Sequence, residues 1–440
     1  MTSFCAQAAG VAVRFATLHS ENPAECYFAG LFWSFWVTLA LFPIGYGWRE
    51  VMPPVCLVFL LLYYRRAWEY SVLARLEVFP LFCCFWAMIL LGVLFSGDPV
   101  NSLLHAGTGI NKGFILPFIA MECVRAEKDL RRLLWACVFA CFWQGMDGVW
   151  QAYSGQDFVM GYPFSSGRLT GSIGDYAGGN YIALALIPAF ALWFILREKF
   201  GRAESALLAV ALLWPACFLL LGAAARSGML AVAVALGLWW WCVLQGVFIL
   251  RRYLLPCIAA SGLLAFLFVL VLPWRTLPSI SPFSDGRWSL WELAWRVFCE
   301  NPWFGAGAGQ YNTAFRALGL TPARDLITIS HPHNIYLDIL YAHGIIGFIF
   351  GMIFLFGFLI WGYRRIHLGL LAEWQGKISG LYWRLATAFW VGYAGWLVNG
   401  IFGHDFYRTW WLGLAMSYLG IMTGAAVNGI QPDKEEKLHG

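Results

Sequence analysis

The residues best suited to chemistry are His331, Pro332, His333 and Asn334, which stand where a long polar segment meets an apolar run from about 335 to 361. An ionisable imidazole at the mouth of a membrane helix is costly to keep there and usually serves a function. If Pro332 takes the first helical position, His333 lies in the opening turn, where the helix dipole favours a neutral ring. A neutral imidazole can accept a proton from a hydroxyl as a general base. The alternative is a histidine that only caps the helix, and His331 is expected to be structural.

Four basic residues stand at predicted helix ends or in segments that we expect to face outward: Lys112, Arg168, Arg226 and Arg287. Arg226 lies in a very short turn between two apolar segments, and Arg287 lies early in a long polar segment. Guanidinium groups bind phosphate through two parallel hydrogen bonds, so a cluster of them at a membrane surface favours a lipid-linked phosphate or pyrophosphate. Each residue could instead extend to lipid headgroups or close a loop.

The composition is that of an integral membrane protein. Hydrophobic residues make up 60% of the 440-residue chain and charged residues 12%, whereas a soluble domain has about 25% charged residues. We therefore expect one all-α, polytopic membrane domain over residues 1–440. The net charge of +5 is explained by basic residues in loops and needs no nucleic-acid partner.

Apolar stretches of suitable length predict about twelve transmembrane helices. They lie near 27–43, 52–64, 78–96, 110–122, 133–151, 177–196, 205–222, 228–250, 254–273, 334–361, 381–402 and 407–426. The distribution of Lys and Arg places both termini in the cytoplasm. Three substantial segments then face outward, at 97–109, 152–176 and 274–333, the last between the ninth and tenth helices.

The outward segment 274–333 carries aromatic residues at helical spacing: Trp288, Trp291, Trp295 and Phe298. Ser284 or Asp285 is available as an N-cap, and Pro302 lies beyond the end. This pattern predicts an amphipathic helix on the membrane surface or over the helix bundle, with Arg287 at its start. Ordinary packing of the aromatic face against the transmembrane helices is an equal alternative.

Glycines and cysteines indicate packing rather than chemistry. Gly344, Gly347 and Gly351 fall on one helix face, where small residues allow close approach of a neighbour. The run from Gly305 to Gly309 has no preceding strand, so a flexible turn is expected and not a nucleotide site. The cysteines lie mostly in apolar segments, without metal-ligand spacing or a disulfide framework.

These motifs together resemble the O-antigen ligase family. His333-Asn334, nine residues and then Gly344-Ile345-Ile346-Gly347 match that family's H-N-x9-G-x-x-G pattern. Arg226-Ser227-Gly228 is similar to its short outer turn, and Asp285-Gly286-Arg287 to the start of its large periplasmic loop. The resemblance extends over roughly 160–350 by motif and over the whole chain by topology.

The resemblance implies a metal-independent, cofactor-free glycosyltransferase of the GT-C type in a Gram-negative inner membrane, with its active site facing the periplasm. Such ligases transfer a glycan from undecaprenyl pyrophosphate to a sugar of the lipid A core. Carried onto this chain, His333 is the base that activates the acceptor hydroxyl, and Asn334 supports it. Basic residues hold the donor pyrophosphate: Arg226 and Arg287, with Arg168 and Lys112 as further candidates. The lack of an outward carboxylate cluster agrees with metal independence.

Two alternatives remain. O-antigen polymerases and protein O-oligosaccharyltransferases use the same donor with other acceptors, and the motif does not separate them. A transporter or lipid flippase would concentrate ionisable groups near the bilayer midplane. Here Asp147 is the clearest charged residue within a span, which makes transport the weaker hypothesis.

Overall fold

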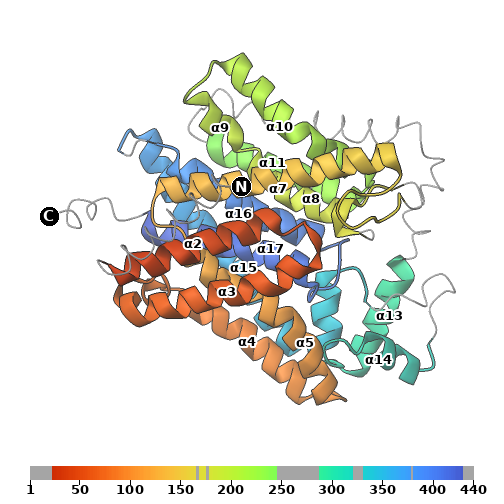
Figure 1. The fold of residues 1–440 in the computed structure, drawn as a ribbon. Coiled ribbons are helices and arrows are strands. Elements are labelled where there is room, and N and C mark those ends of the chain that lie inside the picture. The colour runs from red at the N-terminus through yellow and green to blue at the C-terminus, as the bar shows by residue number, and fades with distance from the viewer. Residues whose placement is uncertain are drawn as a thin grey trace.

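The structure is a computed structural model that describes residues 22–164, 168–174, 178–244, 287–320, 331–377 and 380–429. The longer helices (Figure 1) are α2 (Pro23–Leu41), α3 (Gly45–Ala67), α4 (Phe79–Leu94), α5 (Pro99–Gly113), α7 (Glu127–Ser154), α8 (Gly178–Ala189), α10 (Arg202–Gly222), α11 (Arg226–Leu244), α13 (Arg287–Glu300), α15 (Ile335–Trp374), α16 (Tyr382–Asn399) and α17 (Thr409–Asn428). The short helices are α6 (Leu116–Glu122), α9 (Leu192–Arg197) and α14 (Tyr311–Ala317). These ranges contain no β-strand, and an isolated bridge joins Gln156 and Pro163, so the predicted all-α class is confirmed for them.

Seven helical segments are long and apolar enough to cross a membrane: α2, α7, α8 with α9, α10, α11, α15 and α17. The pair formed by α3 and α4, bent by 89° between Arg75 and Phe79, raises the number to eight. The protein is thus a multi-pass membrane protein, but its described part does not give twelve crossing helices. The predicted stretch 254–273, together with Ser284 and Asp285, lies outside the described residues.

The predicted span at 110–122 is wrong as a single helix. α5 begins at Pro99 and ends at Gly113, and α6 begins at Leu116. Pro117 stands in the first turn of α6, where its ring prevents the preceding residues from continuing a helix. Much of the predicted outward segment 97–109 therefore belongs to a helix.

α17 forms the centre of the bundle, since 94% of its most apolar window is buried. Its glycines allow α6 to approach closely: a Cβ at Gly424 would lie 2.2 Å from the Met121 carbonyl oxygen, and one at Gly420 would lie 2.5 Å from that of Pro117. Small residues at such crossings let helix backbones meet. This packing fixes α17, and with it the segment that precedes it.

Polar groups divide between the two ends of the bundle. Ion pairs gather where α7 and α16 begin and α15 ends: Arg125–Glu25, Arg131–Glu198, Arg365–Glu77 and Arg384–Glu373. At the opposite end, Asn180 Oδ1 accepts hydrogen bonds from Ser227 Oγ at 3.0 Å and from Asn399 Nδ2 at 3.4 Å. The starts of α8, α11 and α15 and the end of α16 therefore lie together there.

α15 is broken at Gly344, which has φ +63° and ψ −170°. The segment between α13 and α14 fills the break. The Ile345 N–H donates to the Pro302 carbonyl at 2.8 Å, and the Ala306 N–H donates to the Tyr341 carbonyl at 2.8 Å. These hydrogen bonds replace the helical ones that the break removes, and they join α13 to the first part of α15.

The glycines of α15 have two different roles. Gly347 and Gly351 lie against Met88 of α4, which agrees with the predicted close packing. Gly344 does not share that role, because its backbone conformation is one that only glycine adopts readily. The run Gly305 to Gly309 is also not a flexible turn: a Cβ at Gly305 would lie 2.4 Å from the Ala342 carbonyl carbon. The turn is docked against α15.

We expect Gly344→Ala to lower the free energy of unfolding by about 1–3 kcal/mol through backbone strain alone. A further loss should come from the added Cβ, which would lie 2.4 Å from the Trp303 carbonyl oxygen. Thermal unfolding in detergent measures the change. Gly107→Ala is the matched control, because a Cβ there meets no atom within 4 Å. Equal melting temperatures for the two variants would contradict the broken helix.

Candidate functional site

The start of α15 is set by Asn334, which is the N-cap. Its Oδ1 accepts hydrogen bonds from the N–H groups of the second and third helical residues at 2.9 and 3.1 Å. Asparagine is among the best residues for this position. His333 therefore precedes the cap, and its predicted place in the opening turn is wrong. Pro332 is likewise not the first helical residue, because the Asn334 side chain supplies the cap two residues later.

The backbone of His333 is strained, with φ +54°. A non-glycine residue in this region costs about 1–3 kcal/mol and is held there by its surroundings. The His333 N–H donates to Nδ1 of His331 at 3.2 Å, and the Trp291 indole N–H donates to the Pro332 carbonyl at 3.0 Å. These contacts support the strained conformation.

The imidazole of His333 has a defined tautomer. Its Nδ1 lies 2.9 Å from the Gly403 carbonyl oxygen, which can only accept, so Nδ1 carries the hydrogen and Nε2 keeps its lone pair. Burial lowers the pKa of His333, the Gly403 hydrogen bond opposes this, and the charges of Arg287 and Arg408 lower it further. The ring is therefore neutral at pH 7, as predicted, but through burial and neighbouring cations.

The loop between α16 and α17 supplies the charged partners of the histidines. Arg408 Nε donates to Asp405 Oδ1 at 2.9 Å, and its Nη2 lies 3.4 Å from His331 Nε2. The carboxylate of Asp338, in the first turn of α15, accepts a hydrogen bond from the Phe406 N–H at 2.7 Å. Burial lowers the pKa of His331 to about 3, so this ring is also neutral.

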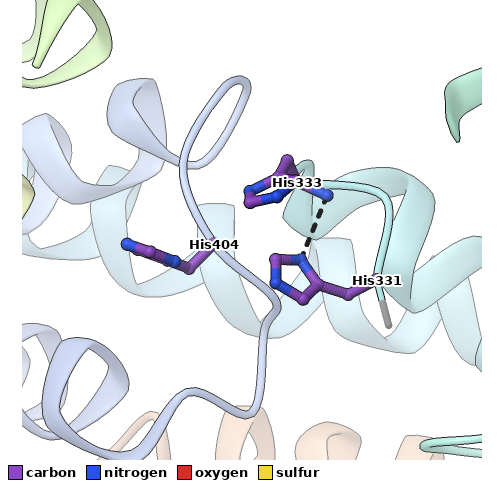
Figure 2. A group of neighbouring side chains, drawn as sticks. All are labelled: His331, His333 and His404. Atoms are coloured by element: carbon purple, nitrogen blue, oxygen red, sulfur yellow. Dashed lines mark hydrogen bonds between the residues drawn. The ribbon is translucent and has the colours of Figure 1, made fainter. Parts of the chain in front are cut away.

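His404 completes a group of three histidines. The ligand nitrogens of His331, His333 and His404 all lie within 4.8 Å of one another. Figure 2 shows that the first two come from the segment before α15 and the third from the loop before α17. Burial lowers the pKa of His404 well below its usual range.

The sequence analysis missed His404, Asp405 and Arg408. A signal was present, because His404 and Asp405 lie between the apolar stretches 381–402 and 407–426, and Arg408 stands at the start of the second. In the predicted topology these residues face the same side as His333. They lie next to His333 because their loop contacts it through Gly403, a residue 70 positions later in the chain.

Arg287 is brought to this site by α13. Leu290 and Val297 of that helix are buried against Tyr311 and Tyr341, so the predicted amphipathic helix is confirmed and packs on α15. Its aromatic residues are divided: the Trp291 ring stacks on Phe402 at 5.6 Å, whereas Trp288 and Trp295 are about half exposed. The charge of Arg287 acts on the pKa of His333, which places it within electrostatic reach of that ring.

Arg226 and Arg168 gather at a neighbouring position. Arg226 is the exposed first residue of α11 and follows a turn in which Ala224 has φ +50°. The N–H of Leu169, which follows Arg168, donates to the Gly222 carbonyl at 3.1 Å, so both arginines adjoin the same turn. Hydrogen bonds of Asn180 with Ser227 and Asn399 join this turn to the end of α16.

Lys112 is the remaining predicted cation. It lies near the end of α5, and the backbone of the next residue, Gly113, adjoins Leu412 of α17. Its side chain lies outside the described residues. Its contribution to an anion site therefore stays a prediction.

This arrangement can accept a proton and stabilise negative charge at the same place. His333 Nε2 offers a lone pair on a neutral ring, and Arg287 and Arg408 contribute positive charge close to it. Asp405 is held by Arg408, with its pKa below the ordinary value although burial opposes this. The carboxylate is thereby placed to orient cations rather than to act as a base.

Residues 208–352 match the family model described as O-antigen ligase. The matched segment contains Arg226, Arg287, His333 and Gly344, and it ends before the loop that carries His404. The match confirms the family resemblance that the sequence motifs indicate. No curated protein matches the chain.

Proposed function

Because residues 208–352 match the O-antigen ligase family, we propose that this protein is a membrane glycosyltransferase of lipopolysaccharide synthesis. It transfers a glycan from undecaprenyl pyrophosphate to a sugar of the lipid A core in the bacterial inner membrane, with the site on the periplasmic side. The observation that carries this proposal is the neutral His333, with Nε2 unprotonated and two arginine charges acting on it.

In the proposed reaction, His333 Nε2 accepts the proton of an acceptor hydroxyl as the hydroxyl oxygen attacks the anomeric carbon of the glycan. The bond from that carbon to the pyrophosphate oxygen breaks, and undecaprenyl pyrophosphate leaves with the electron pair. Attack from the opposite face inverts the anomeric centre. General-base assistance of this kind contributes about 10²–10⁴-fold in rate.

Arginines stabilise the pyrophosphate as its charge develops. Arg287 is assigned here because its charge reaches His333. Arg226 and Arg168 are assigned to the same anion from the adjoining turn, with Lys112 as a further candidate. Arg408 joins this set, since it contacts His331 and its side chain is 39% exposed. No step of this mechanism requires a metal ion or cofactor.

Other acceptors and other functions are tested by the same assay. An O-antigen polymerase or a protein O-oligosaccharyltransferase would use the same donor with another acceptor. A transporter is supported less, because one carboxylate oxygen of Asp147 is used to hold a loop, although the other, Oδ2, is buried without a hydrogen-bond partner among the described residues. Its Oδ1 accepts a hydrogen bond from the Phe158 N–H at 2.7 Å and so holds the loop after α7.

Purified protein in detergent should join a lipid-linked glycan to lipid A core without ATP or metal. His333→Ala should stay folded, with a free energy of unfolding lower by about 1–3 kcal/mol because the Gly403 carbonyl loses its partner. It should lose at least about 10²-fold in transfer rate, because the proton acceptor is gone. His367→Ala, on the part of α15 beyond the break, is the control and should transfer normally. Normal transfer by His333→Ala would remove the base assignment, and lipid movement without transfer would support a flippase.

Arg287→Ala and Arg226→Ala should each lower kcat/KM for the donor by about 10- to 100-fold, the value of a hydrogen bond to a charged group. The acceptor KM should change little. Arg296→Ala is the matched control for α13, because Arg296 pairs with Glu292 at 2.5 Å on an exposed face. Steady-state kinetics with each substrate varied in turn measure the effects on donor and acceptor separately. A change in the acceptor KM alone would refute the pyrophosphate assignment.

The pH dependence should follow the neutral form of His333. Transfer requires the unprotonated ring, and the pKa of His333 lies below the ordinary value of 6.5. The acid limb of kcat/KM should therefore have its midpoint below pH 6.5, with activity lost as the pH falls through it. Arg287→Gln removes a charge that lowers this pKa, so its acid limb should move to higher pH. A wild-type midpoint above 6.5 would contradict the assignment.

A further inference from the structure

The three histidines form a cluster that the proposed mechanism uses only in part. Their ring centroids are 4.1 Å apart for His331 and His333, 6.3 Å for His331 and His404, and 6.1 Å for His333 and His404 (Figure 2). One nitrogen from each ring lies within 4.8 Å of the other two. Imidazole nitrogen is a common ligand of zinc and of similar divalent transition metals.

The imidazole of His404 is not hydrogen-bonded to any described residue. Both of its ring nitrogens are shielded from solvent, and neither has a hydrogen-bond partner among the described residues. The ring lies against Trp410 and Trp411 instead, with centroids 5.2 and 5.9 Å away. A buried polar group left in this state is unfavourable, and a metal ion would satisfy one of the nitrogens.

His333 is already arranged as a metal ligand would be. Its Nδ1 donates to the Gly403 carbonyl at 2.9 Å, which leaves Nε2 with an available lone pair. A ligating histidine characteristically donates its second ring N–H to a carbonyl or carboxylate. The contact that directs the proposed base therefore also prepares it to bind a cation.

His331 requires two local changes. Its Nδ1 accepts the His333 N–H, so the hydrogen of the neutral ring is on Nε2, which lies 3.4 Å from Arg408 Nη2. Metal binding at Nε2 requires that hydrogen to move to Nδ1, which opens the contact with the His333 N–H. The Arg408 side chain is 39% exposed and can turn toward solvent. Asp405 Oδ1, 3.8 Å from the same nitrogen, then offers negative charge to the metal.

From these contacts we infer that His331, His333 and His404 form an inhibitory site for a zinc-like divalent transition metal. Tetrahedral zinc at about 2.0–2.1 Å from each nitrogen sets the nitrogens roughly 3.4 Å apart, so small ring rotations close the site. Bound metal takes the Nε2 lone pair of His333, and the ring can no longer accept a proton. The inhibitory effect rests on the proposed transferase function, whereas the metal binding does not.

Metal binding to the three histidines is tested on the full-length protein in detergent after treatment with a chelator. Calorimetric titration with Zn²⁺ should give one site in the wild type, and His404→Gln should weaken it by at least about tenfold. His367→Gln, a histidine elsewhere on α15, should bind as the wild type does. Zn²⁺ should also raise the melting temperature of the wild type but not of a folded His331→Ala. Absence of binding to the wild type, or equal binding by His404→Gln, overturns the site.

Inhibition by the bound metal is tested with the glycan-transfer assay. Zn²⁺ should block wild-type transfer, EDTA should restore it, and His404→Gln should need at least about tenfold more Zn²⁺ for the same inhibition. Zinc binding that depends on His404 in a protein with no transfer activity would refute the proposed function and leave the metal site standing. Transfer unaffected by saturating Zn²⁺ would refute the inhibition.

Discussion

The contact between the start of α15 and the loop before α17 determines the geometry of the site. The Gly403 carbonyl accepts the His333 Nδ1 hydrogen, and the Asp338 carboxylate accepts the Phe406 N–H. Each hydrogen bond contributes only about 0.5–1.5 kcal/mol net, but a buried polar group that loses its partner costs about 1–3 kcal/mol. The loop and the helix are therefore held together, and the ring keeps one orientation.

Burial and neighbouring cations keep the candidate base neutral, although its hydrogen bond to Gly403 opposes this. Cations that bind a pyrophosphate would favour a neutral histidine in their midst, and burial acts in the same direction. The carboxylate of Asp405 is kept ionised by its neighbours and in turn orients Arg408. The unprotonated Nε2 of His333 can thus lie close to positively charged arginines. Burial favours this neutral state of the ring more than exposure to water would.

The sequence was informative where one residue type in one local setting was sufficient. A histidine at the edge of an apolar run and arginines in outward turns could be recognised, and helices lie at each predicted apolar stretch within the described residues. It was less informative where a role depends on backbone conformation or on distant contacts. Gly344 was predicted to pack, although its positive φ breaks the helix. His404 was missed because its neighbours come from a segment about 70 residues earlier.

For the proposed reaction, the same electrostatics favour one order of substrate binding. In the free protein, Arg287 and Arg408 lower the pKa of His333 and so reduce its strength as a base. A bound pyrophosphate would offset those charges and raise the pKa again, because an anion near an imidazole favours its protonated form. His333 would then accept a proton more readily once the donor is in place. Donor binding before deprotonation of the acceptor is the order that this arrangement would favour.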